Sequence, residues 1–157
     1  MPFDAAFLDA RAAARAVDLV MPMMTASLDD PRVGQSGFLH VVIMHPLADP
    51  QRHALEASIL YEASVGDRAK WDADYAAYAR GKAEMAWRTR MDGHAACALY
   101  PHLLRQGMQP LWGSVYAHGI AVGVSGANPW FDEAFAGAVA YALRAVAKEG
   151  VQSIVQP

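Results

Sequence analysis

The chain has 157 residues, of which 54% are hydrophobic and 18% charged, and its formal net charge is −3. This length fits one domain with a substantial core, and the apolar excess favours a homo-oligomer over a monomer. The sequence has no cluster of basic residues, which argues against nucleic-acid binding, and no apolar run of membrane-spanning length. Because the start also lacks the features of a secretion signal, we expect a soluble cytoplasmic protein. The one cysteine, Cys97, excludes an internal disulfide.

The first half of the chain predicts a helix, a strand pair and a second helix. Residues 3–21 are rich in alanine and carry apolar side chains on one face, and Pro22 is expected to end or kink this helix. The apolar run 38–44 is typical of a buried strand, and after a turn the segment 55–62 favours a strand that forms a hairpin with it. Residues 70–88 then show the apolar spacing of a helix.

The second half predicts a short helix at 96–106, two strands of a hairpin at 111–116 and 120–125, and a long helix at 129–149. His118-Gly119 is short enough to join the two strands directly. Gly150 stands where a helix C-cap is expected, and residues 151–155 suit a short edge strand. The order helix, two strands, helix, two strands, helix indicates an α+β fold in one domain, residues 1–157, with helices flanking an antiparallel sheet.

Small residues mark the junction between the last predicted strand and the long helix: Gly123, Ser125 and Gly126. Asn128 is suited to cap the helix, and the acidic residues Asp132 and Glu133 suit its positive end. Such a turn leaves backbone N–H groups facing outward, which favours an anionic ligand group. The same glycines equally suit close packing of a strand against a helix, so both interpretations stay open.

Lys82 interrupts an apolar stripe on the predicted helix at 70–88. The stripe consists of Trp71, Tyr75, Tyr78 and Met85. An ammonium in this position must reach water, pair with an acid or contact a ligand, and the sequence leaves these outcomes open. Trp87 points away from the stripe onto a polar face, where an exposed tryptophan favours a subunit contact.

The six histidines show no spacing typical of a zinc or di-iron site, so no metal centre of that kind is expected. A single imidazole is enough to bind haem iron, and the candidates are His94 and His118, which lie in loops near the ends of predicted elements. Ser125 lacks the flanking spacing of a hydrolase nucleophile. Because no set of acid, base and nucleophile stands out, the sequence assigns no catalytic residue.

Three segments together resemble the GlcG/HbpS-like family, also called the haem-degrading domain family. They are Val122-Gly123-Val124-Ser125-Gly126-Ala127 followed by Asp132-Glu133-Ala134, then Gly81-Lys82-Ala83, and the run from Trp71 through Lys82 to Arg88-Thr89-Arg90, which is closer to an uncharacterised branch. The resemblance covers residues 38 to 148. The sequence departs from the family pattern at Trp112-Gly113, which replaces a Gly-Gly pair and narrows the expected pocket, and at His45-Pro46-Leu47-Ala48-Asp49.

The resemblance implies a profilin-like sandwich that assembles into homo-oligomers, from dimers to octamers. Some members bind or degrade haem, and others accompany glycolate or diol metabolism. By analogy, the ligand-binding residues are Lys82, Gly123, Ser125, Gly126, Asp132 and Glu133, with His94 or His118 as a haem ligand.

Three functional hypotheses follow. An oligomeric small-molecule-binding protein would hold haem or a small carboxylate at the turn 123–126, with Lys82 opposing its charge. An enzyme that degrades haem or processes a small acid needs a proton-transfer group, for which His94 and His118 are the candidates. A ligand-free oligomer that binds a partner protein explains the apolar composition and Trp87, and leaves Lys82 to reach solvent.

Overall fold

The computed structural model describes residues 3–108 and 110–156, and its elements follow the order expected from the sequence. In chain order they are α1 (Ala10–Ser27), β1 (Leu39–Met44), β2 (Ile59–Val65), α2 (Tyr75–Thr89), α3 (Gly93–Leu99), β3 (Ser114–Ala117), β4 (Ile120–Ser125) and α4 (Pro129–Val155). Short 3-10 turns lie at Glu56–Ser58, Arg68–Lys70 and Pro101–Leu103. Within the described ranges, no helix combines the length and the hydropathy that crossing a bilayer requires.

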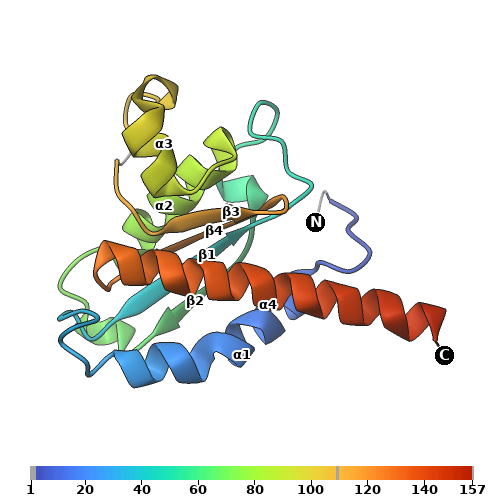
Figure 1. Cartoon of the computed structure of the whole chain (residues 1–157), viewed down its shortest axis with the longest axis horizontal. Helices are drawn as coiled ribbons and strands as arrows, with labels where there is room; N and C mark the ends of the chain where they lie inside the picture. The colour runs from blue at the N-terminus through green and yellow to red at the C-terminus, as the bar shows by residue number, and fades with distance from the viewer. Residues whose placement is uncertain (1–2, 109, 157) are drawn as a thin grey trace.

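The four strands form one antiparallel sheet in the order β2-β1-β4-β3. Helices α1 and α4 cover one face and α2 covers the other, so the sheet lies between two helical layers (Figure 1). The central strands β1 and β4 are buried at every position because both faces are covered. On β1, Val41 and Ile43 face α1 and α4, whereas Val42 and Met44 face α2. The expected α+β fold is confirmed.

Both predicted strand hairpins are present. β2 pairs with β1, but it begins at Ile59 because a 3-10 turn occupies the start of the predicted segment 55–62. β4 has the predicted bounds and pairs with β3. His118 and Gly119 both have positive φ, at 52° and 86°, which is the backbone of a two-residue hairpin turn.

Several helix and strand starts differ from the prediction. α1 begins at Ala10 rather than at residue 3, capped by the Asp9 carboxylate, and it continues through Pro22. Pro22 is exposed, so water can satisfy the carbonyl that its missing N–H leaves unbonded. α2 begins at Tyr75, after the capping residue Asp74, rather than at residue 70. Likewise, α3 ends before the predicted limit of 106, and β3 begins three residues after the predicted start at 111.

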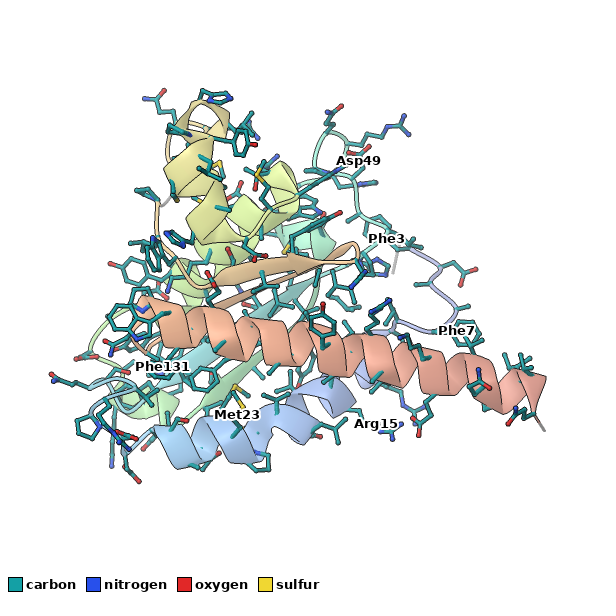
Figure 2. The ribbon with its side chains drawn as sticks, in the orientation of Figure 1. Phe3, Phe7, Arg15, Met23, Asp49 and Phe131 are labelled. Carbon is teal, nitrogen blue, oxygen red and sulfur yellow. The ribbon has the colours of Figure 1, made fainter. Side chains whose placement is uncertain are left out.

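α4 is longer than predicted. It runs through Gly150 to Val155, so the predicted cap at Gly150 and the predicted edge strand at 151–155 are wrong. A Cβ at Gly150 would lie 2.9 Å from Cδ1 of Phe7. Figure 2 shows Phe7 beside the C-terminal half of α4. The glycine therefore allows the N-terminal segment to approach the helix closely, and it does not end the helix.

The prediction that Trp87 is exposed is also wrong. Its side chain is buried in the core between α2 and the sheet, together with Val42 and Met44. The indole Nε1 donates to the carbonyl of Ala48 at 3.2 Å. The loop after β1 covers this tryptophan, so Trp87 offers no surface for a subunit contact.

Candidate functional site

Lys82 is buried on the face of α2 that packs against β4. Its Nζ donates to Asp132 Oδ2 at 2.9 Å and to Ser125 Oγ at 3.4 Å. Of the outcomes that the sequence left open, pairing with an acid is the one observed, and reaching solvent is not. The ion pair joins α2, β4 and the first turn of α4.

The Asp132 carboxylate fills the position that was expected for a ligand anion. Its Oδ1 accepts the N–H of Ala127 at 2.9 Å, and the N–H of Asn128 donates to the carbonyl of Val33 at 2.8 Å. The expectation of outward-facing N–H groups is therefore wrong for these two residues. The chain supplies its own anion both to the turn and to Lys82.

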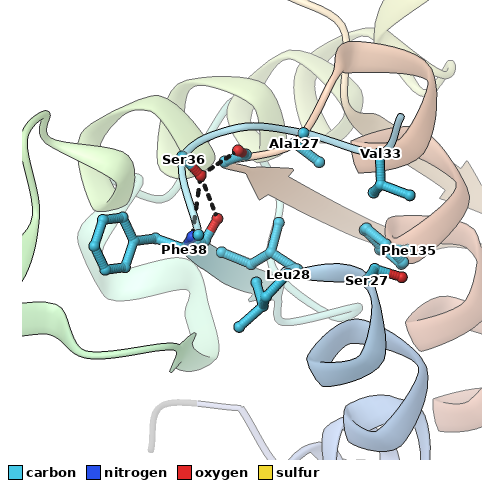
Figure 3. A pocket seen from close by; sticks show the side chains of 11 residues that line it. Ser27, Leu28, Val33, Ser36, Phe38, Ala127 and Phe135 are labelled. Carbon is cyan, nitrogen blue, oxygen red and sulfur yellow. Dashed lines mark hydrogen bonds between the residues drawn. The ribbon is translucent and has the colours of Figure 1, made fainter. Parts of the chain in front are cut away.

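The loop before β1 closes the other side of this turn. The hydroxyl of Ser36 donates to the carbonyl of Gly126 at 2.5 Å and accepts the N–H of Phe38 at 3.0 Å (Figure 3). The adjacent cavity measures about 10 Å³, which holds about one water molecule and no organic ligand. Gly126 has a φ of +136°, and a Cβ there would overlap the carbonyl oxygen of Phe38, so the position requires glycine.

Two further glycines bring the elements close around the ion pair. A Cβ at Gly123 would overlap the α2 backbone at Ala79 and Ala83, so Gly123 faces that helix. Gly113 precedes β3 with a φ of +118°. A Cβ at Gly113 would lie 2.8 Å from Asp132 Cβ and 3.0 Å from Lys82 Cδ. In this structure, both glycines permit close packing.

The acid of the ion pair titrates in an unusual range. Burial raises the pKa of Asp132 from 3.8 to about 6, although Lys82 and the N–H groups of Ala127 and Gly126 lower it. Shifted carboxyl groups of this kind cluster at functional sites, and they also occur in structural ion-pair networks. The ion pair alone therefore does not distinguish a ligand site from a structural element.

A second polar group lies beside the ion pair, where α3 and β3 begin. Ser114 directly follows Gly113, its side chain is fully buried, and its Oγ has no hydrogen-bond partner among the described residues. Gly93, the first residue of α3, lies against this hydroxyl, which a Cβ would overlap. Asp92 accepts the N–H of Tyr116 at 2.9 Å. Sequence reasoning missed Ser114 and Asp92, because neither stands in a recognisable motif.

Glu133 also has a buried oxygen, Oε2, for which residues 3–108 and 110–156 provide no hydrogen-bond partner. Burial raises the pKa of Glu133, and the nearby Asp92 carboxylate raises it further, whereas His94 lowers it. Buried polar atoms are nearly always hydrogen-bonded in native proteins, so an unpaired one calls for an explanation. Two such atoms, Ser114 Oγ and Glu133 Oε2, therefore lie around the start of α3, next to the ion pair.

The structure brings His94 to this site but does not bring His118 there. The imidazole of His94 lies against the indole of Trp112, with ring centroids 3.5 Å apart. His118 lies in the hairpin turn before β4, at the opposite end of that strand from Ser125. The Nε2 atom of His118 is 3.5 Å from the hydroxyl of Tyr141. Across residues 3–108 and 110–156, no group of three or more His, Cys, Asp or Glu side chains is arranged to hold a metal ion.

Another buried histidine, His40 on β1, belongs to a separate and fully paired network. Its Nδ1 lies 2.8 Å from Ser64 Oγ, and its Nε2 lies 3.1 Å from Glu62 Oε1. Glu62 in turn accepts two hydrogen bonds from Arg80, each at 2.7 Å. This network ties α2 to β2, and both ring nitrogens of His40 have a partner within it.

No protein-family model and no curated protein matches this chain. Among the solved structures that share its fold are the following two. Klebsiella pneumoniae protein ORFY, described as DUF336, is 14% identical with a TM-score of 0.58, over 91% of this chain and 94% of that one. The PduOC haem complex is 18% identical with a TM-score of 0.50, over 89% of this chain and 95% of that one. These matches confirm, at the level of the fold, the resemblance to the GlcG/HbpS-like family.

Proposed function

We propose that this chain is a small-molecule-binding protein whose ligand contacts Ser114 and Glu133. The observation that carries the proposal is that two buried atoms at this site, Ser114 Oγ and Glu133 Oε2, have no hydrogen-bond partner in the described part of the chain. Leaving a buried hydrogen-bonding group unpaired costs about 1–3 kcal/mol, so a ligand that pairs with both gains a corresponding affinity. The Lys82–Asp132 ion pair, packed against the neighbouring Gly113, holds the start of β3 in place.

The charges of the site favour an uncharged ligand oxygen, such as a hydroxyl or a carbonyl. Lys82 is already neutralised by Asp132, while Asp92 and Glu133 add acidic groups. A ligand carboxylate at this position meets like charge and no free ammonium. The small carboxylate of the sequence hypothesis therefore fits only when Glu133 is protonated, and the raised pKa of Glu133 favours that form.

Haem is the second ligand of the sequence hypothesis, and one of the solved structures with this fold contains it. The residues of a single copy of this chain do not fit haem. Trp112 covers one face of the His94 ring, and among the described residues no histidine lines the cavities of about 690, 460 and 440 Å³. We therefore propose no reaction that involves haem, and haem is included as one probe in the binding measurements below.

Thermal-shift and titration measurements with propane-1,2-diol, glycolate and haem test this proposal. Ser114→Ala and Glu133→Ala are expected to weaken binding of the successful probe by about tenfold or more, because each removes one partner. Glu149→Ala on the same helix is the matched control, since Glu149 is exposed and pairs with Arg15 at the surface. Equal affinity in all three variants would place the ligand elsewhere.

An enzymatic function is supported by one further observation at the same site. Glu133 combines a raised pKa with a neighbouring acid, Asp92, and a neighbouring imidazole, His94. A carboxyl group with a raised pKa is better suited to proton transfer than an ordinary surface carboxylate, and proton transfer is what general acid–base catalysis requires. If a bound probe is turned over, Glu133→Gln should abolish turnover. Residual binding to that variant without turnover would separate catalysis from binding.

The exposed apolar surface supports assembly into a homo-oligomer. Leu19 and Met23 on α1 and Tyr141 on α4 are each roughly half exposed, and the two helices pack side by side. Light scattering after gel filtration should show an oligomer that Leu19→Glu dissociates, because a buried carboxylate disrupts an apolar contact. Leu99→Glu on α3 is the matched control, since Leu99 is equally exposed on the other side of the sheet. A monomeric native protein would contradict this assembly.

A further inference from the structure

Three arginines from two separate segments line one cavity of about 690 Å³. Arg88 and Arg90 lie at the C-terminal end of α2, and Arg105 lies in the segment after the 3-10 turn at Pro101–Leu103. The loop after β1, which contains Asp49, forms the third wall. Figure 2 places Asp49 at the edge of the molecule remote from α1. This cavity does not include Ser114 or Glu133.

The three guanidinium groups differ in how they are held. Arg88 donates to Glu84 Oε1 at 2.7 Å and to the carbonyl of Pro50 at 3.0 Å, so its position is fixed. Arg90 is the C-cap of α2 and has a φ of 56°, a conformation uncommon for any residue except glycine. Within the described part of the chain, no carboxylate pairs with Arg90 or Arg105.

The acidic residue in the wall does not neutralise these arginines. The carboxylate of Asp49 lies 3.5 Å from Arg52 Nε. Arginine near the C-terminal end of a helix is favourable without any ligand, which accounts for Arg88 and Arg90 in part. It does not account for Arg105, which comes from a different segment and brings a further positive charge to the same cavity.

We propose that this cavity binds a small polyanion that carries a phosphoryl group or two carboxylates. Arginine presents a planar fork of donors that matches both of these oxyanions, and two unpaired guanidinium groups favour a ligand with at least two negative charges. A volume of about 690 Å³ is within the range of small-molecule sites. The whole chain has a net charge of −3, so this cluster of arginines is a local positive feature of an acidic protein.

Calorimetric titration of the whole chain with inorganic pyrophosphate and with succinate, at constant ionic strength, tests the proposal. We expect a Kd below about 1 mM for at least one of the two anions, with affinity falling as salt is added. Tighter binding of pyrophosphate identifies a phosphoryl ligand, and tighter binding of succinate identifies a dicarboxylate.

The double variant Arg90→Gln/Arg105→Gln should weaken that binding by about tenfold or more. Arg11→Gln/Lys70→Gln is the matched control, because it removes the same charge from exposed positions outside the cavity. Equal loss of affinity in the two double variants would show a general charge effect and would overturn the proposal. So would the absence of binding of both anions to the folded native chain.

Discussion

Replacing Lys82 with methionine tests the buried ion pair by its pH dependence. The side chains of Lys82 and Asp132 are 6% and 1% exposed, and Nζ lies 2.9 Å from Oδ2. At an effective dielectric constant of about 20, this separation corresponds to an attraction of roughly 6 kcal/mol. Lys82 lowers the pKa of Asp132, so without the ammonium this pKa should rise further above its native value of about 6 and the carboxyl should be protonated in the folded variant at neutral pH.

The sign of the effect follows from the raised pKa of Asp132. The pKa of Asp132 is 3.8 in the unfolded chain and about 6 in the folded native protein. The stability contributed by the protonated acid is therefore complete below pH 3.8 and is lost as the pH rises through about 6. In Lys82→Met, the free energy of unfolding continues to fall above pH 6, by about 1.4 kcal/mol per pH unit. The native protein itself loses only about 0.4 kcal/mol above pH 6, so relative to it the variant should lose about 2 kcal/mol more at pH 8 than at pH 6.

Urea unfolding followed by tryptophan fluorescence at pH 6, 7 and 8 measures this difference. The control is the double variant Lys82→Met/Asp132→Asn, in which the amide oxygen still accepts the Ala127 N–H but cannot titrate. We expect the additional pH dependence to disappear in the double variant. If the loss of stability in Lys82→Met is the same at pH 6 and pH 8, Lys82 does not control the protonation of Asp132.

Three further substitutions should change stability in ways that the fold explains, and urea unfolding checks each. Gly126→Ala should destabilise by about 1–3 kcal/mol, because of the positive φ and the overlap with Phe38; an unchanged midpoint would contradict the turn geometry. Trp87→Phe should cost about 1 kcal/mol through loss of the hydrogen bond to Ala48, whereas no change would indicate an exposed indole. Gly150→Ala should stay within about 1 kcal/mol of native stability, because the gain in helix propensity offsets the displacement of Phe7; a larger loss would indicate that the helix ends there.

The sequence predicted elements well where local pattern and tertiary environment agree. β4 has the predicted bounds because its β-forming residues lie between a two-residue turn and a glycine turn. Gly150 was misinterpreted because close packing and helix termination favour the same residue, and only the position of Phe7 distinguishes them. Trp87 was misplaced because the loop that buries it lies nearly forty residues earlier in the chain.

The candidate site was predictable in part for the same reason. The apolar surroundings of Lys82 in the helix indicated an unusual environment, and Asp132 stood at a recognisable helix start. Their pairing, across 50 residues of sequence, depends on how α2 and α4 meet at β4. Ser114 carries no local signal, because the lack of a hydrogen-bond partner for its hydroxyl among the described residues results from tertiary packing alone.

Native mass spectrometry of the purified protein, compared with Glu133→Ala, tests the proposed binding function most directly. We expect a small molecule bound to the native protein, with occupancy reduced by about tenfold or more in the variant. The same adduct at equal occupancy in both proteins, or a native protein that carries no adduct with or without added haem, glycolate or propane-1,2-diol, would contradict it.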